Sequence, residues 1–440
     1  MTDYSRPDLR RYLGGTNHML TIASRVRAWV GKRMLARAMK DGFDLSKLSH
    51  LPDHMYMPLR RNGVDPVPEL GQLRERAPIS KLDLPFDLNA WLVTGHAEAR
   101  EVLMKSAGYS TDIRHLLGQA AKDETGGLGF TDPPDHTRLR KILTPEFTMR
   151  RISRLRPTIQ RIVDERLDLL EKAGPGADLA AIFAFPIPFL VICELLGIGE
   201  DGREEFQHLG TARFDVSNGG PGAFDAIAES RSFIRAAVKE QRVEPGDGLL
   251  GMIIREHGDG IDDEELAGLA DGVFTGGYET TAAMLALGTM VLLRDRSHYD
   301  AMRDADDDAV HRTVEELLRY LAVVQVAFPR FAKEDITVGD ASVSAGDVVL
   351  VSLSGANRDS SLGTDMDTFD PTREPTPHLT FGHGIHRCIG AELARMELRA
   401  AYPSLSRRFP SLRLGVPAAE LEFRKHSLVY GIESLPVTWD

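Results

Sequence analysis

The chain has 440 residues, 42% of them hydrophobic and 27% charged, and its formal net charge is −12 at pH 7. This composition indicates a globular protein with a large core, and the acidic balance argues against nucleic-acid binding and against general affinity for anionic membranes. Cys193 and Cys388 are its two cysteines, too few for a disulfide framework, which favours a reducing, cytoplasmic setting.

The N-terminal part of the chain predicts neither a signal peptide nor a transmembrane segment. Residues 19–39 are partly apolar but carry basic side chains along their length, so this segment cannot span a bilayer. Further along, residues 90–94 alternate in the manner of a strand that ends at Gly95. Residues 107–135 are rich in Gly, Asp and Pro and predict a long loop of the kind that carries function.

The middle of the chain, from about 136 to 334, predicts mostly helices. Apolar residues recur at helical spacing over 138–173 and 261–296, and the glycine-rich stretch 218–222 marks a break between two helices. Alternation over 335–353 predicts a β-hairpin around residues 345–347, and a helix over 389–402 is expected to stop before Pro403. The fold class is therefore mainly α with a small β region.

Cys388 is the strongest candidate for chemistry. It lies in the sequence FGHGIHRCIG of residues 381–390, whose glycines allow the backbone to approach a flat, bulky group. A thiol at the start of the following helix has a lowered pKa, which favours the thiolate that an iron ligand needs. A buried structural cysteine is one alternative, and a zinc site with His383 and His386 is another, without an evident fourth ligand. Cys193, in an apolar segment, is interpreted as a core residue.

The pattern Phe381-x-x-Gly384-x-x-x-Cys388-x-Gly390 resembles the haem loop of the cytochrome P-450 family. The resemblance implies the P-450 fold and heme b (iron protoporphyrin IX) with Cys388 as its axial thiolate. It also implies a monooxygenase that inserts one oxygen atom from dioxygen into a lipophilic small molecule, by hydroxylation or epoxidation. Because the likeness covers the chain beyond its first 40 to 50 residues, we predict an N-terminal extension of unknown role over 1–50 and a single P-450 domain over 51–440.

A possible ion-pair motif precedes this loop in the chain. Glu316 and Arg319 are three residues apart on one helix face and can pair, which an exposed surface pair would equally explain. The resemblance adds Arg373, in the sequence FDPTR of residues 369–373, as the third member of a buried structural triad. Such a triad must be complete, because one unpaired buried charge costs about 3–5 kcal/mol. We expect it to hold the loop that presents Cys388.

A glycine-rich motif, GGYETT of residues 276–281, lies in the middle of the long helix over 261–296. Thr280 follows Gly276 by four residues, so its hydroxyl can bond the Gly276 carbonyl and distort the helix. Close helix packing is the plainer explanation of the glycines. By resemblance this is the oxygen-activation motif, with Gly276 where Ala is frequent and with Glu279 and Thr280 as the catalytic pair. Glu279 is expected on another face of the helix, turned toward a water channel.

Four residues are candidate partners for the two haem carboxylates, which need cations or hydrogen-bond donors. His136 and Arg140 are four residues apart on one helix face, where a solvated basic face is the alternative explanation. By resemblance His136, Arg140, Arg330 and His386 contact the propionates.

Electrons are expected from a separate ferredoxin and ferredoxin reductase, because no flavin or nicotinamide domain is fused to the chain. The substrate is expected to be a lipophilic small molecule of secondary metabolism, bound by residues 107–130, 218–222, Phe274, Val324 and Val326. The same fold could instead catalyse peroxide-driven oxidation, oxidative coupling or isomerisation, or serve only to bind a partner. Docking of the electron donor is predicted on the face of the basic residues Arg140, Lys141, Arg150, Arg151 and Arg387.

Overall fold

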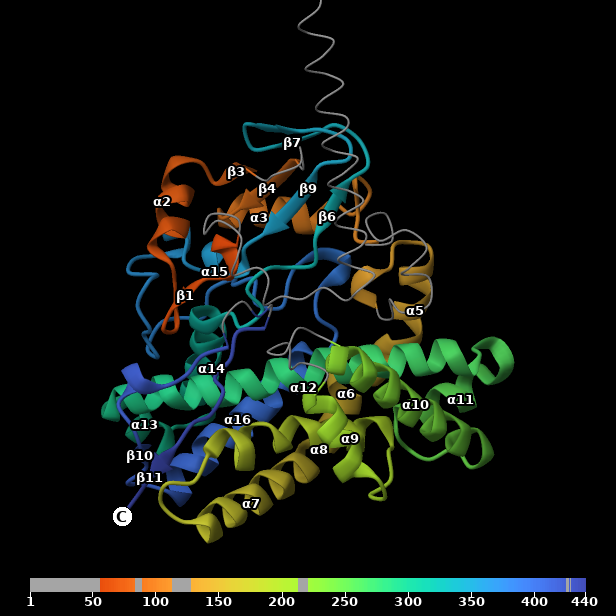
Figure 1. The fold of residues 1–440 in the computed structure, drawn as a ribbon, viewed down its shortest axis with the longest axis vertical. Coiled ribbons are helices and arrows are strands. Elements are labelled where there is room, and N and C mark those ends of the chain that lie inside the picture. Colours follow the sequence, from red (N-terminus) through yellow and green to blue (C-terminus); the bar gives the residue numbers. More distant parts are fainter. Residues whose placement is uncertain (1–55, 84–88, 113–127, 213–220, 425–426, 428) are drawn as a thin grey trace, which may run out of the picture.

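Helices make up most of the fold (Figure 1). The computed structural model describes residues 56–83, 89–112, 128–212, 221–424, 427 and 429–440. The α-helices are α2 (Pro68–Arg76), α3 (His96–Met104), α5 (Asp135–Leu143), α6 (Met149–Ile152), α7 (Arg156–Ala173), α8 (Pro186–Leu196), α9 (Arg203–Ala212), α10 (Pro221–Val243), α11 (Leu249–His257), α12 (Asp263–Arg294), α13 (Arg296–Arg303), α14 (Asp307–Leu321), α15 (Leu353–Ala356) and α16 (Ala391–Arg408).

The β structure is small, as predicted. Within the described ranges, one five-stranded sheet has the order β3-β4-β9-β6-β5, and three two-stranded sheets pair β1 with β2, β7 with β8 and β10 with β11. The strands are β1 (Arg61–Asn62), β2 (Asp65–Pro66), β3 (Ile79–Asp83), β4 (Asn89–Val93), β5 (Tyr109–Ser110), β6 (Arg330–Ala332), β7 (Ile336–Val338), β8 (Ala341–Val343), β9 (Val348–Val351), β10 (Arg413–Leu414) and β11 (Val437–Thr438).

The central helix of the molecule is α12, which crosses it between the five-stranded sheet and the helices α7 to α11 (Figure 1). Asp262 caps its first turn by accepting a hydrogen bond from the backbone N–H of Glu265 at 2.8 Å. Its C-terminal half is buried from Thr281 to Leu292 and belongs to the largest core cluster, together with residues of α7, α8, α14 and α16. A helix that is apolar on all sides is a core helix, and α12 therefore fixes the positions of its neighbours.

Two predicted elements differ from the structure. The hairpin over 335–353 is wrong in its pairing: β7 pairs with β8 around Gly339, and β9 lies parallel to β4 and antiparallel to β6. Val349 and Val351 of β9 are fully buried there, so burial in the larger sheet outweighs the local alternation. The prediction that a helix stops before Pro403 is also wrong, because α16 continues to Arg408. Its buried C-terminal residues compensate for the cost of an internal proline, about 3 kcal/mol.

The helical pattern over 138–173 divides into α5, α6 and α7, which are linked by short 3-10 turns. The predicted extension over 1–50 lies outside the described residues, as do 218–220 of the expected helix break. None of the helices in the described ranges combines the length and the apolar character that crossing a bilayer requires.

Candidate active site

The loop that carries Cys388 is fixed by its own backbone. The N–H of Cys388 donates to the carbonyl of Phe381 at 2.8 Å, and that of Gly382 donates to Leu379 at 2.7 Å. Gly384 has a φ of 72°, and a Cβ there would lie 2.4 Å from the carbonyl oxygen of Leu103 in α3. Only glycine tolerates both conditions. The loop therefore packs closely on α3 and leaves Cys388 exposed just before α16.

The pKa of the Cys388 thiol is raised, which corrects the expectation of a lowered value. The side chain is accessible, yet it lies among dense protein, and this poor solvation outweighs the backbone N–H of Gly390 and the charge of Arg140, which both act to lower the pKa. A metal that binds the sulfur displaces this proton. Cys193 is fully buried in α8, where burial raises its pKa to about 12, as suits a core cysteine.

Gly276 and Thr280 form an accessible patch of helix surface in the middle of α12. The Thr280 hydroxyl donates to the Gly276 carbonyl at 2.6 Å, the bond that the spacing predicts. Gly276 is exposed, and in the described part of the chain no atom apart from its chain neighbours and the backbone of its own helix lies within 4 Å of the place where its Cβ would be. Gly277, by contrast, packs against Ile192, which a Cβ would meet at 2.3 Å. A core helix that is open on one face at its centre has room there for a ligand.

Glu279 lies on another face of α12, as predicted, but it is buried and ion-paired rather than turned toward a water channel. Its carboxylate accepts a hydrogen bond from Nη1 of Arg424 at 2.6 Å. The guanidinium of Arg424 also lies 5.0 Å from the ring centre of Phe185 and 3.5 Å from the exposed carboxylate of Glu433. Sequence reasoning missed Arg424, which is 145 positions from Glu279 and belongs to no local motif.

Three of the predicted propionate partners meet beside a small cavity. The rings of His136 and His386 are 4.3 Å apart, and Arg330 and His386 line the cavity together with Tyr109. Burial is the largest cause that lowers the pKa of His386 to about 3, and the positive charges of Arg330 and His136 lower it further. Burial also lowers the pKa of Arg330, to about 10. Arg140 is half-buried, and burial lowers the pKa of its guanidinium. The nearby sulfur of Cys388 acts in the opposite direction and raises that pKa.

Several polar atoms of this group lack hydrogen-bond partners in the described part of the chain. They are both ring nitrogens of His136, Nδ1 of His386 and the hydroxyl of Tyr109, all buried. Unpaired buried polar atoms are rare, so their concentration here, beside the Arg330 guanidinium, indicates a site for a ligand that forms hydrogen bonds. These polar atoms and the guanidiniums of Arg140 and Arg330 are groups that would hold the carboxylates of a haem, and the accessible Cys388 would supply a sulfur ligand to its iron. Tyr109 lies within the predicted functional loop over 107–135, but the sequence did not single it out as a cofactor contact.

The predicted triad residues are brought together behind the loop. Nε and Nη2 of Arg319 donate to the two carboxylate oxygens of Glu316, each at 2.7 Å, and Nε of Arg373 donates to Glu316 at 3.2 Å. Arg319 also donates to the carbonyls of Asn357 and Met366 at 2.9 and 2.7 Å. The arrangement ties α14 to the segment that leads to Cys388, and no exposed surface pair is involved.

The residues predicted to contact the substrate differ in their burial. Phe274 is fully buried and packs on Phe206 and Tyr278, with ring centres 4.5 and 5.5 Å away, and its contact with substrate stays a prediction. Val324 and Val326 are half-buried. Residues 113–127 of the expected loop lie outside the described residues.

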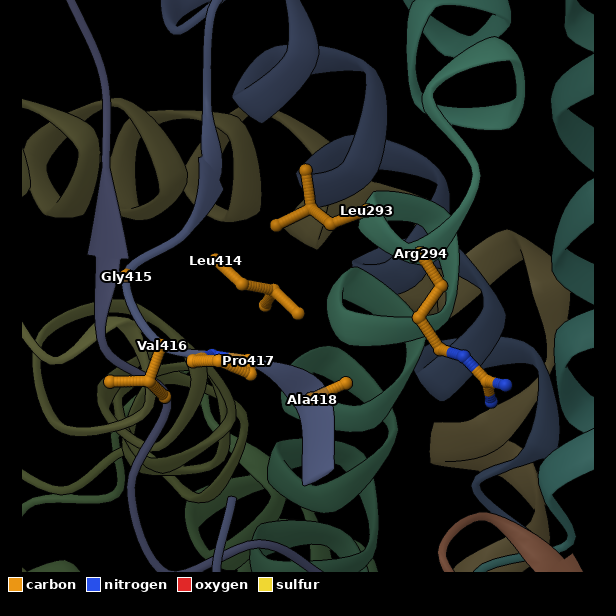
Figure 2. Close-up of a pocket in the computed structure, with 7 residues that line it drawn as sticks. All are labelled: Leu293, Arg294, Leu414, Gly415, Val416, Pro417 and Ala418. Atoms are coloured by element: carbon orange, nitrogen blue, oxygen red, sulfur yellow. The ribbon is translucent and has the colours of Figure 1, made fainter. Parts of the chain in front are cut away.

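A separate surface cavity lies at the C-terminal end of α12 (Figure 2). None of the predicted site residues lines it, so it is not part of the site around Cys388. Its lining residues are Leu293, Arg294, Leu414, Gly415, Val416, Pro417 and Ala418.

Comparison with known proteins agrees with this fold. The family model for Cytochrome P450 matches residues 223–414. Cytochrome P450 165B3 of Amycolatopsis orientalis is 39% identical over 392 residues, which are 87% of this chain and 98% of the relative. The solved P450 StaH from biosynthesis of the glycopeptide antibiotic A47934 is 42% identical with a TM-score of 0.78, covering 87% of this chain and 99% of that chain. OxyC, implicated in an oxidative C–C coupling reaction during vancomycin biosynthesis, is 39% identical with a TM-score of 0.79, covering 87% and 96%.

The fold and the relatives together define the class of this protein, which is an oxidoreductase of the monooxygenase type. The predicted fold, mainly α with a small β region, is confirmed. The chain belongs to the cytochrome P450 family.

Proposed function

We propose that this chain binds heme b through Cys388 and inserts one oxygen atom from dioxygen into a lipophilic small molecule of secondary metabolism. The observation that supports this proposal is the group of buried polar atoms of His136, His386 and Tyr109 that have no hydrogen-bond partner in the described part of the chain, close to Arg330. When bound, haem supplies the redox chemistry that activates dioxygen. A cytoplasmic location and electrons from a separate ferredoxin and its reductase complete the proposal.

The proposed cofactor contacts follow from the chemistry of the donors. Cys388 supplies the sulfur, and the backbone N–H of Gly390, which lies near that sulfur, tunes the charge it donates. His136, Arg140, Arg330 and His386 bind the propionates, so that binding replaces missing hydrogen bonds with charge-assisted ones.

Thr280 and Glu279 are the proposed proton-delivery residues. The hydrogen bond from Thr280 to the Gly276 carbonyl orients the hydroxyl of Thr280, whose oxygen can still accept a hydrogen bond from another donor. Glu279, adjacent in the chain but on another helix face, would take a proton from water after release from Arg424 and pass it toward Thr280. General acid–base catalysis of this type contributes about 10²–10⁴-fold to a rate.

The experiment that tests the proposal compares three variants. Cys388→Ala should lose the thiolate-type spectrum of the ferrous–carbonyl complex, whereas Cys193→Ala should retain it. Thr280→Ala should bind haem and consume reduced cofactor but release much of the consumed oxygen as peroxide. The matched control is Thr281→Ala, since Thr281 is buried and lies on the next face of α12. An unchanged carbonyl spectrum in Cys388→Ala contradicts the central assignment.

Oxidative coupling is a second candidate reaction at the same site, and it is favoured by the 39% identity to OxyC, which is implicated in such a reaction. The two reactions differ in where the oxygen goes. Turnover under isotopically labelled dioxygen places the label in the product of hydroxylation or epoxidation, while a coupling product contains none of it.

A further inference from the structure

A second buried ion cluster lies beside the triad, centred on Glu315. Nε and Nη2 of Arg395 donate to its two carboxylate oxygens at 2.6 and 2.8 Å, and Nε2 of His378 lies 3.2 Å from one of them. Burial opposes the charge of Glu315, but the hydrogen bonds from His378 and Arg395 lower its pKa to about 2. The cluster therefore contains a carboxylate that joins α14, α16 and the start of the Cys388 loop.

Arg395 connects this cluster to the cysteine. Its guanidinium carbon lies 4.6 Å from the ring centre of Phe381, a cation–π geometry. The carbonyl of Phe381 accepts the backbone N–H of Cys388 at 2.8 Å. A continuous series of contacts thus leads from Glu315 through Arg395 and Phe381 to Cys388.

We infer that Arg395 is a positioning residue for the cysteine ligand. It holds Phe381, and through Phe381 the backbone of Cys388. This inference rests on the proposed function, because it gives Cys388 the role of iron ligand.

The contacts of Arg395 require an arginine. Besides Glu315, its Nη1 donates to Glu392 at 2.7 Å, so one planar group binds two carboxylates and covers an aromatic ring. A lysine ammonium is a point charge that cannot match this geometry. Arg399, one helical turn later, is a natural control: it lies 3.9 Å from Glu315 and donates to His311, whereas the cation–π contact to Phe381 belongs to Arg395.

The test uses the purified, haem-loaded full chain and the variants Arg395→Gln, Arg395→Lys, Phe381→Leu and Arg399→Gln. Two properties are measured: the rate at which the ferrous–carbonyl complex changes from the thiolate-type to the thiol-type spectrum, and the reduction potential of the haem. Arg395→Gln should speed this conversion about tenfold, which corresponds to ~1.4 kcal/mol. It should also shift the potential to more negative values, because a positive charge that stabilised the added electron is gone.

The other variants separate positioning from charge. Arg395→Lys and Phe381→Leu should speed the conversion while moving the potential less, since the positive charge stays. Arg399→Gln should leave both properties unchanged. The inference is overturned if Arg395→Gln matches the parent, or if Arg399→Gln changes both properties equally, which would mean a merely structural cluster. If Arg395→Gln does not fold, Arg395→Lys and Phe381→Leu decide by the conversion rate. A parent without any thiolate-type spectrum overturns the proposed function itself.

Discussion

Replacing Arg319 with methionine should cost more stability than most single substitutions. Its side chain is fully buried, forms two hydrogen bonds to Glu316 and donates to three backbone carbonyls, those of Asn357, Met366 and Thr368. Removing one partner of a buried ion pair costs about 3–5 kcal/mol, and each carbonyl left unpaired adds about 1–3 kcal/mol. Even with incomplete additivity the loss exceeds about 5 kcal/mol, which is comparable to the whole stability of an ordinary protein.

Denaturant unfolding and haem content of the purified protein measure this effect. Arg319→Met should give little folded, haem-loaded protein, and Arg319→Lys should rescue it poorly, because three donors cannot serve five acceptor contacts. Arg373→Gln is the control: Arg373 is 14% exposed and its loss leaves the buried Glu316–Arg319 pair intact, so this variant should lose much less stability than Arg319→Met. A free energy of unfolding for Arg319→Met within about 1 kcal/mol of the parent would refute this reasoning, since that is an average single-substitution effect.

Three further predictions concern packing, pH and charge. Gly288→Ala should destabilise the fold by about 1–3 kcal/mol, because a Cβ would lie 2.0 Å from the Tyr402 hydroxyl. In the same thermal-unfolding assay, Gly276→Ala should leave the stability unchanged or raise it by up to about 1 kcal/mol. Equal effects of the two substitutions would contradict the packing argument. The pKa of Glu315, at about 2, is below its ordinary value of 4.5, so its stabilising contribution is present above pH 4.5 and is lost as the pH falls through about 2. The difference in unfolding free energy between parent and Glu315→Gln should therefore shrink over that range, and a constant difference would show that the charge is irrelevant. The rate of reduction by an acidic ferredoxin, measured by stopped flow, should fall as the ionic strength rises. Charge reversal should slow it further at three exposed basic residues, Lys141, Arg150 and Arg387. A rate that does not depend on salt would contradict this prediction.

Local patterns explain which parts of the fold and site could be predicted. The bond between Thr280 and Gly276 and the pair of Glu316 and Arg319 depend on spacing within one helix, and the bounds of α12 agree with its predicted range to within two residues. Arg373 was placed by family resemblance and not by spacing.

Contacts between distant segments left no such signal. Arg424 meets Glu279 across 145 positions and Arg395 meets Glu315 across 80, and neither arginine stands in a pattern that names its partner. The hairpin and the end of α16 were predicted wrongly for the same reason, because burial against remote segments decided both. The raised pKa of Cys388 likewise reflects the surrounding protein and not the helix that follows.

The position of β9 in the sheet has a consequence for synthesis on the ribosome. Trp91 of β4 donates from Nε1 to the carboxylate of Asp347, just before β9, across 256 positions at 2.9 Å. At a translation rate of about 5–20 residues per second, β9 is synthesised on the order of 13–50 s after β4, with which it pairs. A two-stranded hairpin is marginally stable in water, so the nascent chain exposes an unpaired strand edge during that interval. The sequence motif that would bind the cofactor emerges later still, which makes cofactor loading a step that follows translation of nearly the whole chain.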